Sequence, residues 1–173
     1  ELVLREGDSP GIAVPEVTLA DLIAAQAQQR PDAIAVRAGE RSLSFAELLG
    51  RASALARALI AHGAGPETLV AVAVPRTEEL PVALLAVLLS GAGYLPIDSS
   101  YPAQRLDYIL TDAKPAVLLT DSAELALVPA AELPVVLLDE QSAYPTAPLR
   151  ASERRAALRP DHLAYVIYTS GST

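Results

Sequence analysis

Five short, mostly apolar runs alternate with segments that carry helix signals, and this alternation constrains the fold more than any other feature of the chain. The run at residues 69–74 is apolar at every position, as in strands that are buried on both faces of a parallel sheet. The other expected strands cover residues 94–97, 116–120, 135–138 and 162–168. Strands that alternate with helices indicate an α/β fold, in which a mainly parallel sheet is flanked by helices.

The expected helices have clear start and stop signals. Thr18 can cap a helix whose first turn holds Asp21, and Ser44 with Glu47 forms a capping box. We therefore expect a helix between Thr18 and Pro31, followed by a hairpin of residues 33–37 and 41–43 around Gly39. The capping box begins a helix over residues 44–62. Two more helices are expected: one over residues 78–90, capped by Thr77 and ended by Gly91, and one from Pro102 onward. Residues 140–161 are rich in proline and arginine, which predicts a surface excursion.

Charge and composition exclude several classes of function. The net charge is −8, and the 13 Lys and Arg residues are scattered rather than clustered, so we expect no nucleic-acid or membrane partner. The absence of cysteine excludes disulfides, Cys-type zinc sites and Cys nucleophiles. No run approaches the ~20 apolar residues of a membrane span, and the first residues lack a signal-peptide pattern. We therefore expect a cytoplasmic location.

Residues 168–173 combine hydroxyl side chains with one glycine directly after the last expected strand. The hydroxyl groups, which can donate to phosphate oxygens, belong to Thr169, Ser170, Ser172 and Thr173. Gly171 lets the backbone turn so that its N–H groups converge on an anion. The segment is no Walker loop, because Gly-Lys-Ser/Thr does not follow, and no nucleophile elbow, because Tyr168 stands where glycine is required. From these residues alone, a phosphate loop and an ordinary polar turn are equal alternatives.

Three further polar residues have a functional and a structural interpretation, and we favour the structural one for each. His162 lies in the last expected strand, where a packing role is favoured over that of a catalytic base. Asp98 is favoured as a cap or turn residue over a carboxylate catalyst. Arg105 lies on an expected exposed helix face, where it is favoured as paired or solvated rather than catalytic.

Three ordered segments resemble core motifs of adenylation domains from non-ribosomal peptide synthetases. Leu163-Ala-Tyr-Val-Ile-Tyr-Thr-Ser-Gly-Ser-Thr173 resembles the phosphate-loop motif of that family. Leu43-Ser-Phe-Ala-Glu-Leu48 resembles the first core motif, and Ser90-Gly-Ala-Gly-Tyr-Leu-Pro-Ile-Asp98 with Tyr101-Pro-Ala-Gln-Arg105 resembles the second. The resemblance covers roughly residues 18–173. It implies the N-terminal part of the large subdomain of an adenylate-forming enzyme, preceded in residues 1–17 by a linker from an upstream domain.

The resemblance implies a ligase that converts an amino acid and Mg-ATP to aminoacyl-AMP and pyrophosphate. The acyl group is then transferred to the phosphopantetheine thiol of a carrier domain. By resemblance, Thr169, Ser170, Gly171, Ser172 and Thr173 cradle the β- and γ-phosphates of ATP. The partners it implies are the amino-acid substrate, a peptidyl carrier domain, an upstream condensation domain and an MbtH-like protein.

Much of the machinery of that family has no counterpart in this sequence. The Gly-x-Pro-Lys-Gly continuation of the loop, the amino-acid pocket, the ribose-binding Asp, the Mg²⁺ carboxylate and the catalytic Lys all come later in the family. We therefore expect that the chain stops in a loop that is mobile without ligand, that it holds no catalytic residue or metal ligand, and that it is inactive alone. A related acyl- or aryl-acid ligase and a non-catalytic docking domain remain as alternatives.

Overall fold

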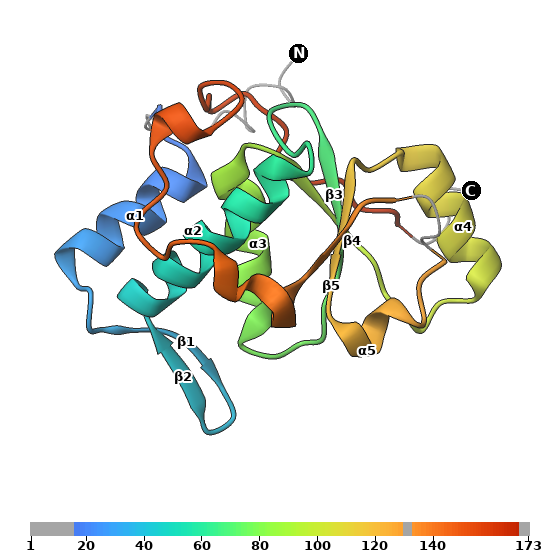
Figure 1. The fold of residues 1–173 in the computed structure, drawn as a ribbon, viewed down its shortest axis with the longest axis horizontal. Coiled ribbons are helices and arrows are strands. Elements are labelled where there is room, and N and C mark those ends of the chain that lie inside the picture. Colours follow the sequence, from blue (N-terminus) through green and yellow to red (C-terminus); the bar gives the residue numbers. More distant parts are fainter. Residues whose placement is uncertain (1–15, 130–132, 170–173) are drawn as a thin grey trace, which may run out of the picture.

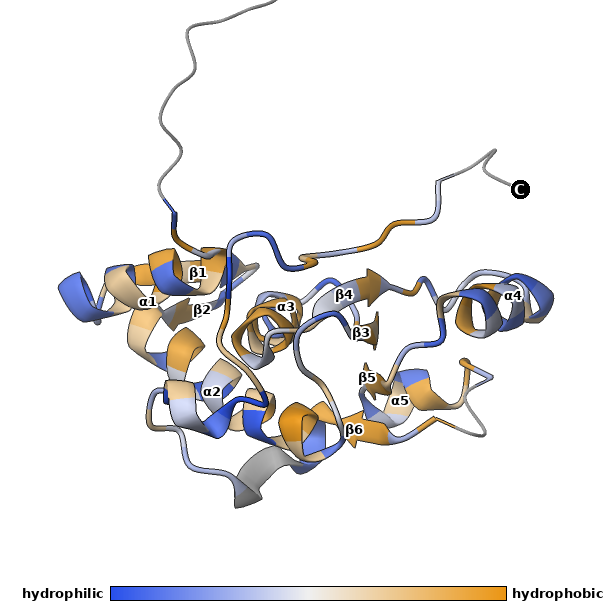
Figure 2. Ribbon diagram, turned by 90° about the horizontal axis from the view of Figure 1, so that it is seen from above, coloured by the Kyte–Doolittle hydropathy of each residue, from blue (hydrophilic) through white to orange (hydrophobic). Residues whose placement is uncertain are grey.

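The computed structural model describes residues 16–129 and 133–169 of the 173-residue chain, and these residues form three layers. A four-stranded sheet lies between two groups of helices, with α2 and α3 on one side and α4 and α5 on the other (Figures 1 and 2). This arrangement confirms the predicted α/β class. No helix within the described residues is long and apolar enough to cross a membrane.

The four strands of the sheet are parallel, in the order β4-β3-β5-β6. They are β3 (Leu69–Ala73), β4 (Gly93–Pro96), β5 (Val117–Thr120) and β6 (Val135–Leu137). Val70 of β3 is paired with Tyr94 on one side and with Val117 on the other. The strands begin and end within one residue of the ranges predicted from the apolar runs, because a buried strand has to be apolar along its whole length.

The segment before the sheet consists of two capped helices and a hairpin. They are α1 (Leu19–Gln29), β1 (Ile34–Ala38), β2 (Arg41–Ser44) and α2 (Phe45–Ala61). The Thr18 side chain accepts from the N–H of Asp21, and the Ser44 side chain accepts from the N–H of Glu47; both capping boxes are complete. These caps bridge only three residues, so the local sequence specifies them and the prediction is confirmed.

The remaining helices are α3 (Glu79–Ser90), α4 (Ala103–Ala113) and the short α5 (Ser122–Leu125), with 3₁₀ helices at Leu138–Ala143 and Ala151–Glu153. The predicted cap of α3 is wrong by one residue, because the N-cap is Glu78, whose side chain makes no capping bond. The Thr77 hydroxyl still accepts from the N–H of Glu79, and Gly91 ends α3 with φ of 93°, as predicted. The sequence prediction missed α5, although Asp121 caps it by accepting from the N–H groups of Ala123 and Glu124.

Alternate residues of β3 face different helices, and this places two cores on opposite sides of the sheet. Val70 and Val72 join the larger core with α1, α2 and α3, whereas Ala71 and Ala73 join a smaller core with α4. All four side chains are at most 3% exposed. The run is therefore apolar at every position because both faces of β3 are covered.

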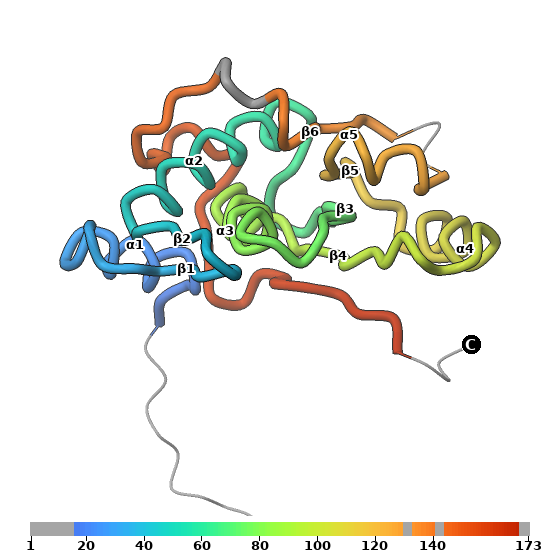
Figure 3. Tube along the Cα trace, turned by 90° about the horizontal axis from the view of Figure 1, so that it is seen from below, coloured from blue at the N-terminus to red at the C-terminus, as the bar shows by residue number. Residues whose placement is uncertain are grey.

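The last predicted strand, residues 162–168, is wrong for most of its length. Only one parallel bridge forms, between Tyr94 and Tyr165: the N–H of Tyr94 donates to Ala164 O, and the N–H of Val166 donates to Tyr94 O. Pro96 is the next residue of β4 that faces this segment, and proline has no N–H with which to continue the ladder. Beyond the bridge the segment runs beside β4 and on toward α4 as an extended chain (Figure 3).

Candidate functional site

A cavity of about 460 Å³ lies beyond the carboxyl ends of β3 and β4. Its walls include residues 74–76 after β3, residues 97–99 after β4, and Ile167 and Tyr168 of the C-terminal segment. The helix that follows β3 packs against one face of the sheet, and the helix that follows β4 packs against the other. The cavity therefore lies at the topological switch point, where ligands of doubly wound sheets bind.

Tyr168 fixes the C-terminal segment to α4 at the rim of this cavity. Its hydroxyl donates a hydrogen bond to the carboxylate of Asp112, and its ring packs edge-on against Tyr108, with 6.4 Å between centroids and 86° between planes. Burial and, next, the hydrogen bond to Asp112 raise the pKa of Tyr168 to about 12. The hydroxyl therefore keeps its proton and acts as a donor throughout the neutral range.

Asp98 closes the turn after β4, as the structural interpretation predicted. Its Oδ1 accepts from the backbone N–H of Ser100 at 3.0 Å and from the Ser100 hydroxyl at 2.6 Å. These hydrogen bonds hold the pKa of the Asp98 carboxyl below its ordinary value, and the positive charge of Arg76 adds to the effect. A carboxylate that is occupied in this way stabilises the turn and is a poor proton acceptor.

The guanidinium of Arg105 contacts an aromatic ring rather than a carboxylate. The Cζ atom lies 4.8 Å from the centroid of the Tyr101 ring, within the range of a cation–π contact. Its Nε is buried without a hydrogen-bond partner among the described residues. The prediction that Arg105 is paired rather than catalytic agrees with this contact.

Both histidines are bonded locally. Nδ1 of His162 accepts from the backbone N–H of Arg159 at 3.2 Å, and Nδ1 of His62 lies 2.9 Å from the carbonyl oxygen of Ala58 in the last turns of α2. Neither contact involves a second titratable side chain. These contacts agree with the structural role that the sequence favoured for His162.

Thr169 is the part of the predicted phosphate loop that the structure describes. It is exposed, and it follows Tyr168 at the rim of the cavity. The other predicted site residues, Ser170, Gly171, Ser172 and Thr173, lie outside the described residues. Within residues 16–129 and 133–169, no three Asp, Glu or His side chains lie close enough together to hold a metal ion.

Sequence reasoning missed Asp112 as a member of this site. Asp112 is 56 residues away from Tyr168 along the chain. In the sequence it is one of two acidic residues, with Asp107, on the polar face of an amphipathic helix, so no local pattern distinguishes it. The contact depends on the path of the C-terminal segment, which runs beside β4 toward α4.

Comparison with known proteins assigns the chain to a family. The family model described as AMP-binding enzyme matches residues 23–173. A dimodular nonribosomal peptide synthase from Bacillus subtilis (strain 168) is 44% identical over 167 residues, which is 92% of this chain and 7% of that protein. Novobiocin biosynthesis protein H from Streptomyces niveus is 43% identical over 172 residues, which is 95% of this chain and 29% of that protein. The chain thus spans a minor part of these relatives.

Solved structures have the same architecture. The nonribosomal peptide synthetase FmoA3, in its α-methyl-L-serine-AMP-bound form, matches with a TM-score of 0.86 and 33% identity, over 97% of this chain and 19% of that chain. The N-terminal subdomain of NpsA from Klebsiella oxytoca shares the fold, with a TM-score of 0.78 and 24% identity over 92% of this chain and 40% of that one. The chain therefore belongs to the AMP-binding enzyme family, in which it resembles the adenylate-forming domains of nonribosomal peptide synthetases.

Proposed function

We propose that this chain is the N-terminal portion of an amino-acid-adenylation domain, with residues 18–173 in the domain and residues 1–17 as its upstream linker. The observation that carries the proposal is the path of the C-terminal segment. It pairs with the edge strand β4 through one bridge, and its residues Ile167 and Tyr168 line the cavity at the switch point, directly before Thr169. The matches to nonribosomal peptide synthetases over most of the chain support the same assignment.

In the proposed reaction, a carboxylate oxygen of the amino acid attacks the α-phosphorus of ATP. A phosphorus–oxygen bond forms, the bond between the α-phosphorus and the bridging oxygen breaks, and pyrophosphate leaves. The phosphopantetheine thiol of a carrier domain then attacks the acyl carbon and releases AMP. Such a reaction depends on positioning and on the stabilisation of negative charge.

This chain contributes the phosphate-binding part of the site. We assign to Thr169, Ser170, Gly171, Ser172 and Thr173 the donation of hydroxyl and backbone N–H groups to the β- and γ-phosphates. Mg²⁺ would neutralise phosphate charge, and on the family resemblance we place its ligands elsewhere in the enzyme.

The proposed partners are those of a peptide-synthetase module. They are a peptidyl carrier domain and an upstream condensation domain, supported by the multimodular size of the relatives, of which this chain covers 7% or less in several cases. An MbtH-like protein is proposed from the family resemblance alone. The cytoplasmic location stays a prediction.

Amino-acid-dependent ATP–pyrophosphate exchange by the full-length enzyme tests the proposal. The panel contains the proteinogenic amino acids, together with fatty and aryl acids as the alternative substrates. We expect exchange with one or a few amino acids and none with the other acids. Exchange only with fatty or aryl acids indicates the related ligase, and no exchange with any acid indicates a non-catalytic domain.

Substitution within the loop tests the residue assignment. Ser172→Ala is expected to lower the exchange rate at limiting ATP by about tenfold, as for the loss of a hydrogen bond to a charged group. Thr111→Ala removes an exposed hydroxyl on α4 and serves as the matched control, with no change expected. Equal rates for both variants would remove Ser172 from the phosphate site.

A further inference from the structure

The backbone contact between the C-terminal segment and the sheet ends before the proposed loop begins. Within residues 163–168, the last backbone hydrogen bond from this segment to β4 is donated by Val166. Ile167 and Tyr168 make none with β4, and Pro96 cannot donate one. Backbone pairing with β4 therefore places residues 164–166 and does not extend to Ile167 and Tyr168.

Beyond this point the side chain of Tyr168 makes the next contact with the fold. Its hydroxyl reaches the carboxylate of Asp112 in the last turn of α4, and its ring contacts Tyr108 one helical turn earlier. The helix is anchored in the smaller core by Leu106, Ile109 and Leu110, which are at most 8% exposed. Tyr168 is thus held by a helix that is anchored in the smaller core.

From this geometry we propose that Tyr168 and Asp112 form a positioning pair for the phosphate loop. The hydrogen bond fixes the start of the segment 169–173 relative to the carboxyl ends of β3 and β4, so that less conformational freedom is lost when ATP binds. The inference rests on the function proposed above. Neither residue contacts ATP in this scheme; both act through the loop that follows Tyr168.

The chemistry of the pair suits this role. A hydroxyl bonded to an ionised carboxylate makes a stronger and more directional hydrogen bond than a neutral pair. Burial and the hydrogen bond to Asp112 raise the pKa of Tyr168 to about 12, and the hydroxyl is a donor at neutral pH. The tyrosine ring has only two side-chain torsions, so little conformational freedom is lost when it packs against Tyr108.

A loop that is less well placed binds the nucleotide less tightly, while a distant amino-acid pocket is unaffected. We therefore expect Tyr168→Phe and Asp112→Asn each to raise KM for ATP by about tenfold, as for a lost hydrogen bond to a charged group. KM for the amino acid should stay within twofold. The double variant should be no worse than either single variant, because the two residues make one interaction.

The experiment measures ATP–pyrophosphate exchange by the full-length enzyme, with the amino acid identified in the substrate panel, together with the thermal midpoint of each variant. Tyr165→Phe, three residues earlier in the same segment, removes a hydroxyl but keeps the ring that stacks on Tyr94 at 5.5 Å. Asp107→Asn removes a charge from the same helix. Both controls should leave KM for ATP unchanged.

Two results would overturn the positioning pair while the wild-type enzyme exchanges normally. One is an unchanged KM for ATP in both Tyr168→Phe and Asp112→Asn. The other is a lower thermal midpoint with equal changes in both KM values, which indicates a contact that only stabilises the fold. If the wild-type enzyme shows no ATP–pyrophosphate exchange with any acid, the result contradicts the proposed function instead. It then also contradicts the positioning pair, which rests on that function.

Discussion

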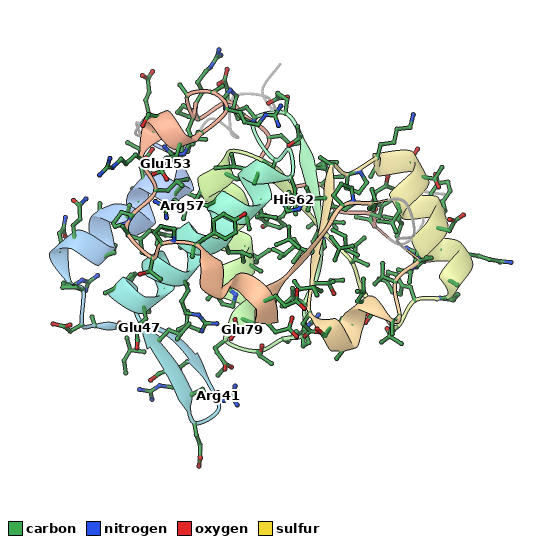
Figure 4. The ribbon with its side chains drawn as sticks, viewed as in Figure 1. Arg41, Glu47, Arg57, His62, Glu79 and Glu153 are labelled. Atoms are coloured by element: carbon green, nitrogen blue, oxygen red, sulfur yellow. The ribbon has the colours of Figure 1, made fainter. Side chains whose placement is uncertain are left out.

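The guanidinium of Arg57 in α2 binds the carboxylate of Glu153, which lies 96 residues further along the chain (Figure 4). Nε donates to Oε1 at 2.7 Å and Nη2 donates to Oε2 at 3.1 Å, while Nη1 donates to the carbonyl oxygens of Pro145 at 2.7 Å and of Ala147 at 2.8 Å. The Arg57 side chain is 12% exposed. One side chain thus holds the excursion between β6 and the C-terminal segment against α2.

Arg57→Ala should release this excursion without unfolding the sheet. Because several hydrogen bonds are lost together, we expect amide hydrogen exchange in residues 144–153 of the full-length enzyme to rise by about tenfold or more. Arg51→Ala is the matched control, since Arg51 lies on the same helix and pairs with Glu79. The expectation fails if both variants exchange alike in this region.

The pairing of Glu78 with Arg41 makes stability depend on acid pH. Nη1 of Arg41 donates to Oε1 of Glu78 at 2.6 Å, and the Glu78 side chain is 8% exposed. This hydrogen bond, with a backbone one, holds the pKa of the Glu78 carboxyl below its ordinary value. The unfolded chain therefore takes up the proton at a higher pH than the folded chain does.

It follows that the stabilisation is complete above the ordinary carboxyl range and is lost as the pH falls through the lowered pKa of the folded state. We expect the thermal midpoint to fall between about pH 5 and pH 3, and to fall less steeply in Glu78→Gln. Glu40→Gln, beside Arg41 on the hairpin turn, should follow the wild-type curve. Parallel curves for wild type and Glu78→Gln would contradict the assignment. Other carboxyls with lowered pKa values add to the wild-type slope: Glu47, Asp98, Asp139, Glu153 and Asp161.

Gly91 and Gly39 allow backbone strain to be separated from steric overlap. Gly91 has φ of 93°, and a Cβ there would lie 2.8 Å from Cδ2 of Leu158 and 3.0 Å from Cδ of Pro66. Gly39 has φ of 60°, and a Cβ there would meet nothing within 4 Å. Gly39→Ala should lower the free energy of unfolding by about 1 kcal/mol through backbone strain alone. Gly91→Ala should lower it by about 2–4 kcal/mol, because steric overlap of the new Cβ adds to the backbone strain. Denaturant midpoints of the two variants check the order, and equal midpoints would show that Leu158 and Pro66 move aside freely.

The 173 residues expressed alone should show no amino-acid-dependent ATP–pyrophosphate exchange. The expectation follows from the family resemblance, which places the amino-acid pocket, the ribose-binding Asp and the catalytic Lys after the phosphate loop. Far-UV circular dichroism should be recorded beside the assay, so that a folded but inactive chain is distinguished from an unfolded one. Robust exchange by the isolated chain would show that these residues are not essential.

Local patterns were sufficient for most helices and for the four strands of the sheet. The capping boxes at Thr18 and Ser44 join residues three apart, and the helix stop at Gly91 depends on one backbone angle. The run at residues 69–74 is apolar throughout because both of its faces are buried. The three family motifs likewise consist of contiguous residues, which is why the sequence alone is enough to recognise them.

Contacts between distant segments could not be predicted in this way. The apolar residues 163–168 have the composition of a strand, but Tyr165 and Ile167 are more than half exposed, and Pro96 limits the pairing to one bridge. The short α5 was missed although Asp121 and Glu124 carry a usable cap signal, because four residues show no helical periodicity.

The sequence by itself determined the α/β class, the capped helices, the apolar strands and the family motifs, since each depends on residues that are neighbours in the chain. Only the tertiary structure decided that Tyr168 meets Asp112 and that Arg57 meets Glu153. Those contacts join residues 56 and 96 positions apart. They exist because the order of the strands brings their elements together, and a polar residue on a helix face gives no sign of which distant partner will reach it.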